Sequence, residues 1–148
     1  MRIAVLGGSF DPIHHGHLMV AAVTKDLLGV DEVRWVPAGE QPFKIGRHAA
    51  PAADRARMVE LAVEDYPAFA VDRCEVDRPG PSYTVDTLAD VGRRFPGAQL
   101  SLVLGSDAAA EFSSWRDPAG IRARAELVIF ARGAEPLPEG VADRVVAV

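Results

Sequence analysis

A short apolar run that ends in two glycines opens the chain, and it constrains the fold more than any other feature. Residues 3–6 are typical of a buried strand, Gly7 and Gly8 follow directly, and a helix-like stretch begins near Leu18. A buried strand that turns through glycines into a helix leaves several backbone N–H groups at one point, and such a point attracts phosphate. The opening of the chain therefore predicts a strand–turn–helix unit with an anion site at the turn.

Two histidines add chemistry to this turn. His14 and His17 are three residues apart, so we expect them on one face of the first helical turn. Backbone donors and paired imidazoles together can stabilise negative charge that develops during a reaction. The run matches neither a Walker loop nor the Gly-x-Gly-x-x-Gly fingerprint. A zinc site and a plain glycine turn with surface histidines remain alternatives, although one cysteine in the chain and no carboxylate at helical spacing disfavour zinc.

Short β-like runs alternate with helical runs along the whole chain. The predicted strands span residues 2–6, 32–37, 69–76, 99–104, 127–131 and 144–148, and the predicted helices span residues 17–28, 52–65, 84–95, 108–111 and 118–124. This alternation predicts right-handed βαβ crossovers and a doubly wound, Rossmann-like α/β fold, with a mainly parallel sheet covered by helices on both faces. Ligands then lie at the carboxyl ends of the strands. The apolar residues at helical spacing are predicted to be core: Met58, Leu61, Ala62, Val85, Leu88 and Val91.

Length and charge restrict the partners. The 148 residues are enough for a single domain, 1–148, that folds alone. A net charge of −5 argues against a general nucleic-acid or anionic-membrane partner, so small anions are the expected substrates. The chain has neither a signal-peptide pattern nor eighteen consecutive apolar residues, which predicts a cytoplasmic protein. Its single cysteine, Cys74, agrees with a reducing compartment and is expected to be a packed side chain rather than a nucleophile. The oligomeric state stays open, a homo-oligomer included.

Residues 7–17 resemble the signature of the nucleotidyltransferases that carry a His-x-Gly-His motif. The remainder, up to about Arg132, is similar to the bacterial nicotinate mononucleotide adenylyltransferases in separated blocks: residues 36–44, 81–88, 104–107 and 114–115. This resemblance implies adenylyl transfer from ATP to nicotinate mononucleotide, which yields nicotinate adenine dinucleotide and pyrophosphate in NAD biosynthesis. The alternatives are phosphopantetheine adenylyltransferase and a nucleotide-binding module without catalysis.

The resemblance also implies a role for individual residues. His14 and His17 would stabilise the α-phosphate and the leaving pyrophosphate, with Mg²⁺ accompanying ATP and no dedicated protein site for the metal. The ATP site would comprise Gly7, Gly8, Ser9, Phe10, Gly16, Lys44, Gly105, Asp107 and Arg132. The nicotinate mononucleotide site would comprise Tyr83, Thr84 and Trp115, of which the first two offer backbone donors at a predicted helix start and the third can stack on a flat ring.

Each of these residues also has a purely structural interpretation. Lys44 and Arg132 are equally typical of solvated surface residues, Trp115 of partial burial, and Asp107 of a cap for a short helix.

Two departures from the family pattern are visible. Phe43 stands where many relatives have histidine, and the chain ends at Val148, where a Ser/Thr-x-x-Arg segment is expected. We expect a truncated or incompletely represented form, and the alternative is a protein that lacks this part of the phosphate site.

Overall fold

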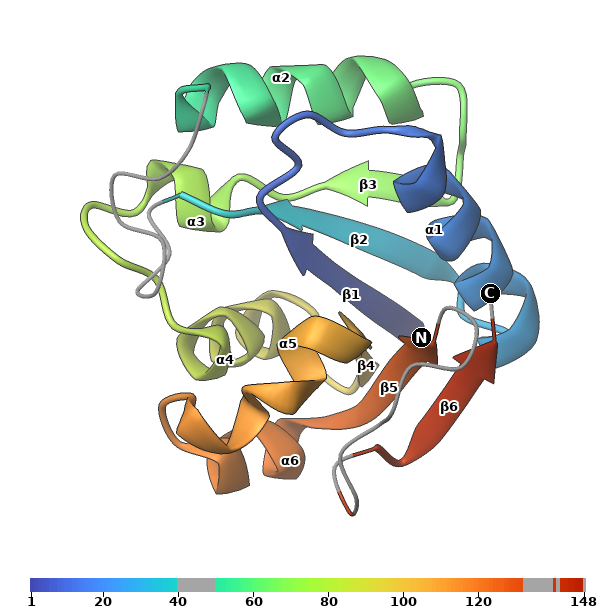
Figure 1. Ribbon diagram of the computed structural model, residues 1–148, viewed down its shortest axis with the longest axis vertical. Coiled ribbons are helices and arrows are strands. Elements are labelled where there is room, and N and C mark those ends of the chain that lie inside the picture. The colour runs from blue at the N-terminus through green and yellow to red at the C-terminus, as the bar shows by residue number, and fades with distance from the viewer. Residues whose placement is uncertain (40–49, 132–139, 141, 148) are drawn as a thin grey trace.

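The protein is built around one six-stranded parallel sheet. The computed structural model describes residues 1–39, 50–131, 140 and 142–147 (Figure 1). Its strands are β1 (Arg2–Gly8), β2 (Glu32–Pro37), β3 (Phe69–Val71), β4 (Gln99–Gly105), β5 (Ala125–Ala131) and β6 (Arg144–Ala147). They lie in the order β3-β2-β1-β4-β5-β6, and every neighbouring pair is parallel. The predicted doubly wound fold is therefore confirmed.

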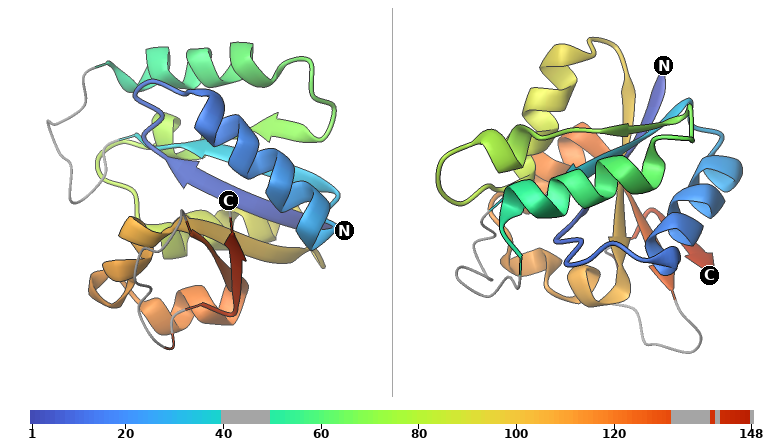
Figure 2. Two further views of the ribbon diagram at one scale, coloured as in Figure 1. Left: turned by 45° about the vertical axis from the view of Figure 1, so that its right-hand side comes forward. Right: turned by 90° about the horizontal axis from the view of Figure 1, so that it is seen from above.

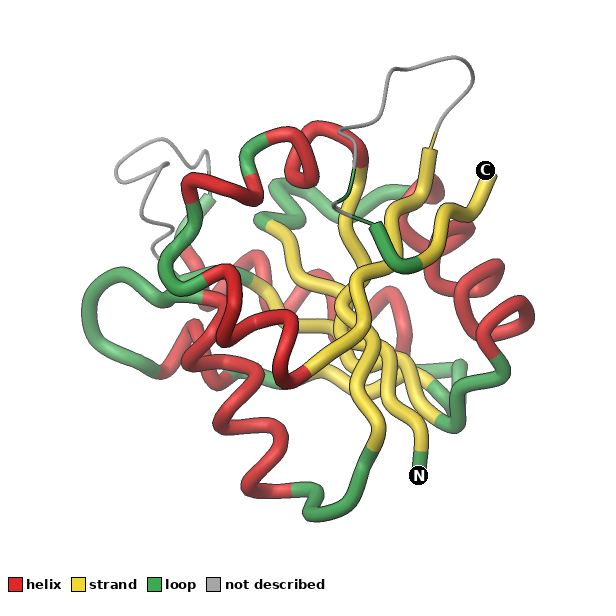
Figure 3. The backbone as a smooth tube through the Cα atoms, turned by 90° about the horizontal axis from the view of Figure 1, so that it is seen from below, coloured by secondary structure: helices red, strands yellow, loops and turns green. Residues whose placement is uncertain are grey.

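Helices cover both faces of this sheet, so that the strands run through the middle of the molecule (Figures 2 and 3). The helices are α1 (His15–Leu28), α2 (Ala52–Val63), α3 (Cys74–Asp77), α4 (Thr84–Arg94), α5 (Ser106–Ala110) and α6 (Pro118–Arg124), with a 3₁₀ turn η1 (Phe112–Ser114). None of these described helices is long and apolar enough to cross a membrane.

Alternate residues of the central strands enter two separate apolar cores. In β1, Ala4 and Leu6 face α1 and α2, whereas Ile3 and Val5 face α4 and α6. All four are at most 5 % exposed. Burial on both faces is why these strands are continuous apolar runs rather than alternating ones.

Strand β1 sits where the winding of the chain changes direction. From β1 the chain goes outward to β2 and β3, and it then returns to place β4 on the other side of β1, with Leu6 opposite Val103. The carboxyl ends of β1 and β4 are Gly8 and Gly105. In open α/β sheets, ligands bind at such a switch point. The glycine turn predicted to bind phosphate is thus at the expected place in the fold.

The predicted strand 69–76 is wrong beyond Val71. The carboxylate of Asp72 accepts a hydrogen bond from the backbone N–H of Cys74 at 3.0 Å, and this bond turns the chain into the short helix α3. The same carboxylate accepts from Arg34 Nε and an Arg94 terminal nitrogen, both at 2.7 Å. Burial alone would raise the pKa of Asp72, but these hydrogen bonds outweigh it and lower the pKa. Asp72 thus anchors the β2–β3 edge to α4.

The predicted core face of α2 is also wrong in part. Leu61 is 50 % exposed, and the buried residues of this helix are Arg55, Ala56, Val59 and Val63. In α4 the prediction is confirmed, because Val85, Leu88 and Val91 are all buried. An arginine therefore occupies a position on α2 where the apolar pattern alone would place an aliphatic side chain.

Candidate active site

The turn after β1 is held in an unusual backbone conformation. Phe10 has a φ of 49°, in the left-handed region that non-glycine residues rarely adopt. Such a conformation costs about 1–3 kcal/mol. The Phe10 ring is only 3 % exposed and packs against the rings of His17 and Trp35, at centroid distances of 5.0 and 5.4 Å. Burying a phenyl ring gains about 2–3 kcal/mol, which offsets the strain and fixes the turn.

The two histidines lie side by side, but one of them is not in the helix. His14 is the N-cap residue of α1, because its Nδ1 accepts the N–H of Gly16 at 3.1 Å. Its own N–H donates to Nδ1 of His17 at 3.0 Å, and the two rings stack with centroids 3.8 Å apart. The prediction that both residues sit on the first helical turn is therefore wrong for His14, although the rings do come together.

These capping bonds decide which ring nitrogen carries the proton. Since Nδ1 of each imidazole accepts a backbone N–H, each neutral ring has its hydrogen on Nε2. Both rings are then Nε2–H donors without needing to be protonated. The N-terminus of α1 adds backbone donors and the positive end of the helix dipole beside them. The arrangement suits an anion, and donors of this kind can stabilise negative charge that develops during a reaction.

The neighbouring strand contributes a second glycine turn. Gly105 is the N-cap residue of α5, and Asp107 is exposed in the first turn of that helix. The alternative in which Asp107 caps the helix is therefore wrong, since the helix begins one residue earlier, at Ser106. Because β4 pairs with β1, this turn lies next to the turn that carries Gly7, Gly8 and Ser9. An exposed carboxylate at this point can accept hydrogen bonds from the hydroxyls of a sugar.

A second group of predicted residues gathers around the start of α4. Tyr83 is its N-cap residue, and Arg116 lies over the Tyr83 ring with its guanidinium carbon 3.8 Å from the centroid. Trp115, next to Arg116, is half-buried and packs at a tilt on Phe112, 5.6 Å between centroids. The structure therefore brings the segment that contains Trp115 to the start of α4 through Arg116, although the two segments are about thirty residues apart in sequence.

One polar atom at the start of α4 has no partner. Ser82 is 6 % exposed, and its hydroxyl lacks a hydrogen bond within the described part of the chain. A buried hydroxyl without a partner costs about 1–3 kcal/mol. Neither Ser82 nor Arg116 was singled out from the sequence. For Arg116 the reason is that its contact with Tyr83 spans 33 residues and leaves no periodic signal.

The structure also places a buried arginine beside the β1 turn, which sequence reasoning missed. Arg55 of α2 is 1 % exposed and donates to four carbonyl oxygens, those of Ser9, Ala38, Gly39 and Ala50. A signal was available, since Arg55 lies at helical spacing with Val59 and Val63.

Two predicted residues, Lys44 and Arg132, lie outside the described residues, as does Phe43.

The described residues do not gather metal ligands. Across residues 1–39, 50–131, 140 and 142–147, no group of three or more His, Cys, Asp or Glu side chains is placed to hold a metal ion. His14 and His17 use Nδ1 for backbone hydrogen bonds, which leaves one nitrogen of each ring for any other contact. A structural zinc site requires four ligands. The geometry of this turn therefore favours an anion over a metal.

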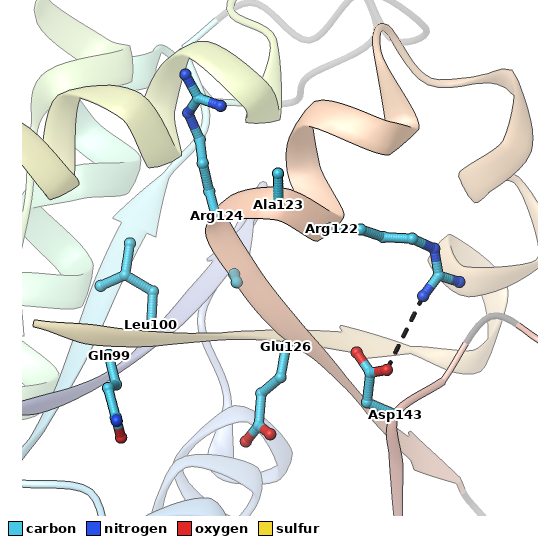
Figure 4. A pocket seen from close by; sticks show the side chains of 8 residues that line it. Gln99, Leu100, Arg122, Ala123, Arg124, Glu126 and Asp143 are labelled. Carbon is cyan, nitrogen blue, oxygen red and sulfur yellow. Dashed lines mark ion pairs between the residues drawn. The ribbon is translucent and has the colours of Figure 1, made fainter.

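An open cavity lies elsewhere, at the opposite end of the sheet. It has a volume of about 490 Å³ and is lined by Gln99, Leu100, Arg122, Ala123, Arg124, Ala125, Glu126 and Asp143 (Figure 4). Gln99 begins β4 and Ala125 begins β5, so this cavity is at the amino ends of the strands. Arg122 and Asp143 face one another across it at 4.0 Å. Its position separates it from the two glycine turns.

We predict that Cys74 is chemically unreactive in the folded protein. Burial, followed by the neighbouring Asp72 carboxylate, raises the pKa of its thiol to about 12. At pH 8 the thiolate is then roughly a thousandfold rarer than for a cysteine of ordinary pKa. Alkylation by iodoacetamide, followed by mass spectrometry, is expected to be slower by about that factor in the native protein than in urea. Equal rates in the two conditions would contradict this assignment.

Comparison with known proteins places these features in a family context. The model of the cytidylyltransferase-like family matches residues 5–144. A probable nicotinate-nucleotide adenylyltransferase of Thermus thermophilus is 45% identical over 139 residues, which cover 94% of this chain and 74% of that protein. A probable nicotinate-nucleotide adenylyltransferase of Corynebacterium kroppenstedtii is 44% identical over 131 residues. The match covers 88% of this chain and 62% of that relative, so the chain spans less than two thirds of the relative's length.

A solved structure supports the fold. The nicotinic acid mononucleotide adenylyltransferase of Plasmodium falciparum, complexed with NaAD, superposes with a TM-score of 0.82. The superposition covers 99% of this chain and 74% of that chain, at 21% sequence identity. At this identity the likeness concerns the architecture, which is the doubly wound sheet described above.

Proposed function

Because this chain belongs to the cytidylyltransferase-like family and, within it, to the family of the nicotinate-nucleotide adenylyltransferases, we propose that it transfers the adenylyl group of ATP to nicotinate mononucleotide. The products are nicotinate adenine dinucleotide and pyrophosphate, in a step of NAD biosynthesis. The observation that carries this proposal is the stacked pair of His14 and His17 beside the β1 glycine turn, at the switch point of the sheet.

The proposed reaction is a direct displacement at phosphorus. An oxygen of the nicotinate mononucleotide phosphate forms a bond to the α-phosphorus of ATP, and the bond from that phosphorus to the β-phosphate oxygen breaks. The protein supplies no covalent nucleophile, so its contribution is positioning and charge stabilisation. The Nε2–H groups of His14 and His17 donate to the α-phosphate and to the leaving pyrophosphate. The N–H groups of Gly8, Ser9 and Phe10 hold phosphate oxygens at the end of β1.

The rest of the proposed ATP site lies around the same two turns. Gly7 and Gly16 allow close approach of the backbone, and Gly105 and Asp107 face the ribose from the β4 side. Lys44 and Arg132 complete the proposed set from the segments that follow β2 and β5. A cationic side chain at either position would contact phosphate or the adenine.

The proposed site for nicotinate mononucleotide is the start of α4. The N–H groups at the start of the helix, beginning at Thr84, can donate hydrogen bonds to the nicotinate carboxylate, as helix N-termini do to anions. Trp115 then stacks on the pyridine ring. The guanidinium of Arg116, held over Tyr83, adds positive charge beside the same carboxylate. This set of groups favours nicotinate over the uncharged nicotinamide.

We propose that Mg²⁺ enters with ATP. Since the described residues offer no cluster of carboxylates or histidines, the ion would be held by phosphate oxygens and water. The chemistry it would supply is partial neutralisation of the phosphate charge. A reaction that consumes ATP and a mononucleotide requires only small-molecule substrates, and it fits an enzyme of the cytoplasm.

The proposal is tested by offering three acceptors separately. Purified protein with ATP and Mg²⁺ is expected to release pyrophosphate with nicotinate mononucleotide, and much more slowly with nicotinamide mononucleotide or phosphopantetheine. Release with phosphopantetheine alone would identify the other adenylyltransferase. Binding of ATP without release from any acceptor would instead indicate a nucleotide-binding module.

Replacing Trp115 with alanine is expected to raise the KM for nicotinate mononucleotide about tenfold, because a stacked ring pair is worth about 0.5–1.5 kcal/mol beyond its buried area. The KM for ATP should stay within twofold, since Trp115 lies near α4 rather than near the β1 turn. Trp115→Phe, which keeps a ring, is the matched control. Steady-state kinetics with each substrate varied in turn measures the effect, and an equal rise in both KM values would contradict it.

A further inference from the structure

We propose that Arg55 is a positioning residue for the phosphate site: by holding the carbonyl oxygen of Ser9, it aims the N–H of Phe10 at the bound nucleotide. The proposal rests on the nucleotide site proposed above, and it assigns a role to a side chain on a different helix, α2. Arg55 does not contact the nucleotide itself. It acts through the backbone of the β1 turn.

Arg55 links three segments of the chain through one guanidinium group. Its Nε donates to Ala50 O at 3.0 Å, one terminal nitrogen donates to Ser9 O and Ala38 O at 2.8 Å each, and the other donates to Gly39 O at 3.1 Å. Ala38 in turn donates its N–H to Gly8 O at 2.9 Å, which ties the end of β2 to the end of β1. The position of the β1 turn is therefore fixed relative to β2 and α2 together.

Peptide geometry converts this hydrogen bond into an orientation. The bond between Ser9 and Phe10 is a planar trans peptide, so its C=O and its N–H point in opposite directions. With the Ser9 carbonyl aimed at Arg55, the Phe10 N–H points away from α2. Phe10 itself has a φ of 49°, a conformation that persists only where its surroundings impose it. The buried Phe10 ring imposes it from one side and the Arg55 hydrogen bond from the other.

Arg55 also places a positive charge under the turn. Burial lowers the pKa of the guanidinium, and the negative charge of Asp11 opposes that shift, but an arginine stays charged in either case. Asp11 Oδ1 accepts the N–H of Ala50 at 3.1 Å, while the carbonyl oxygen of Ala50 accepts from Arg55. Ala50 is therefore held by both Asp11 and Arg55. A buried cation within the turn raises the positive potential that a phosphate group meets there.

The guanidinium shape is essential to this role. Four carbonyl oxygens around a plane match the fork of N–H groups in arginine, whereas a lysine ammonium donates from a single point on a flexible stem. Arg55→Lys keeps the charge and loses the fork, and Arg55→Met keeps the bulk of the stem and loses both. Arg57, exposed on the same helix, provides the control Arg57→Met.

The experiment compares the wild type, the two Arg55 variants and the Arg57 control. Thermal unfolding is recorded for each, and calorimetry gives the affinities for Mg-ATP and, separately, for nicotinate mononucleotide. In ¹⁵N-labelled protein, the amide resonance of Phe10 is followed as Mg-ATP is added. We expect both Arg55 variants to bind Mg-ATP at least tenfold more weakly, with nicotinate mononucleotide affinity within twofold of the wild type and no nucleotide-dependent shift of the Phe10 amide. The Arg57 control should behave as the wild type.

Three results would overturn the proposal. The first is a Phe10 amide in the wild type that does not move on addition of Mg-ATP, and this measurement needs no variant to fold. The second is Arg55→Lys that binds Mg-ATP as the wild type does. The third is a parallel loss of both affinities that follows the fall in melting temperature, which would show a general structural role. If the wild type binds Mg-ATP but releases no pyrophosphate with nicotinate mononucleotide, the proposed function fails, while the binding and resonance measurements still decide the role of Arg55.

Discussion

Replacing His17 with alanine is expected to lower kcat for pyrophosphate release by about 10²–10³-fold, with little change in the KM for nicotinate mononucleotide. The imidazole stacks on His14, 3.8 Å between ring centroids, and in the proposed reaction its Nε2–H donates to the phosphate oxygens on which charge accumulates. Loss of one such preorganised donor typically costs this much in kcat. Steady-state pyrophosphate release, with ATP and nicotinate mononucleotide varied in turn, measures it.

The catalytic effect of His17→Ala must be separated from its effect on the stability of α1. His17 Nδ1 accepts the N–H of His14, so alanine also removes a capping hydrogen bond worth about 1 kcal/mol. His17→Gln keeps an acceptor at this position of the capping box, and it should restore the melting temperature without restoring kcat. His15→Ala removes an exposed imidazole from the same turn and should leave both unchanged. A His17→Gln enzyme of normal kcat would refute the catalytic role.

Replacing Asp72 with asparagine is expected to lower the free energy of unfolding by about 3 kcal/mol at pH 7, the usual order for a broken buried ion pair. The Asp72 side chain is 5% exposed and pairs with Arg34 and Arg94, whose side chains are 14% and 37% exposed. Without the carboxylate, the largely buried Arg34 keeps its ion pair with Glu32, at 3.0 Å, but loses its shorter one with Asp72, at 2.7 Å. Urea unfolding at neutral pH measures the loss. Asp90→Asn, at a more exposed pair with Arg94, is the control and should cost below about 1 kcal/mol.

The effect of Asp72 should depend on pH with a defined sign. Its pKa in the folded protein lies below the unfolded value of about 3.9. The carboxylate therefore contributes its full stabilisation above that value, and the contribution is lost as the pH falls through the folded pKa. The difference between wild type and Asp72→Asn should be constant from about pH 5 to 8 and should shrink below about pH 4. A difference that persists unchanged under acid conditions would show that packing, not charge, is responsible.

The sequence predicts the architecture well because the central strands are buried on both faces. Residues 32–37 and 118–124 are predicted with the bounds that the structure has, since apolar continuity in the first case and the Asp117-Pro118 start in the second are local signals. The strand after residue 68 was predicted too long, because the turn at Asp72 depends on a carboxylate whose partners come from distant segments. Local patterns cannot reveal such partners.

Local patterns predicted the candidate site only where its residues are consecutive, whereas Tyr83, Thr84 and Trp115 were implied by the family resemblance. The glycine turn and the two histidines form one run, and the structure brings them together. The role of His14 as the N-cap was missed, because an imidazole in this place is less usual than Ser, Thr, Asp or Asn. Arg55 and Arg116 were missed for a different reason. Each acts through a contact across more than thirty residues of sequence, Arg55 with Ser9 and Arg116 with Tyr83.

The central place of β1 also sets the order in which the protein can be assembled on the ribosome. Arg2 pairs with Gln99, so β1 waits for one of its two neighbours until roughly a hundred further residues have been made. At about 5–20 residues per second, this delay is about 5–20 seconds. During that time, the edge of β1 that later pairs with β4 has no partner strand. Strand β1 is therefore made long before it reaches its final form, and the proposed phosphate site is complete only once β4 has docked.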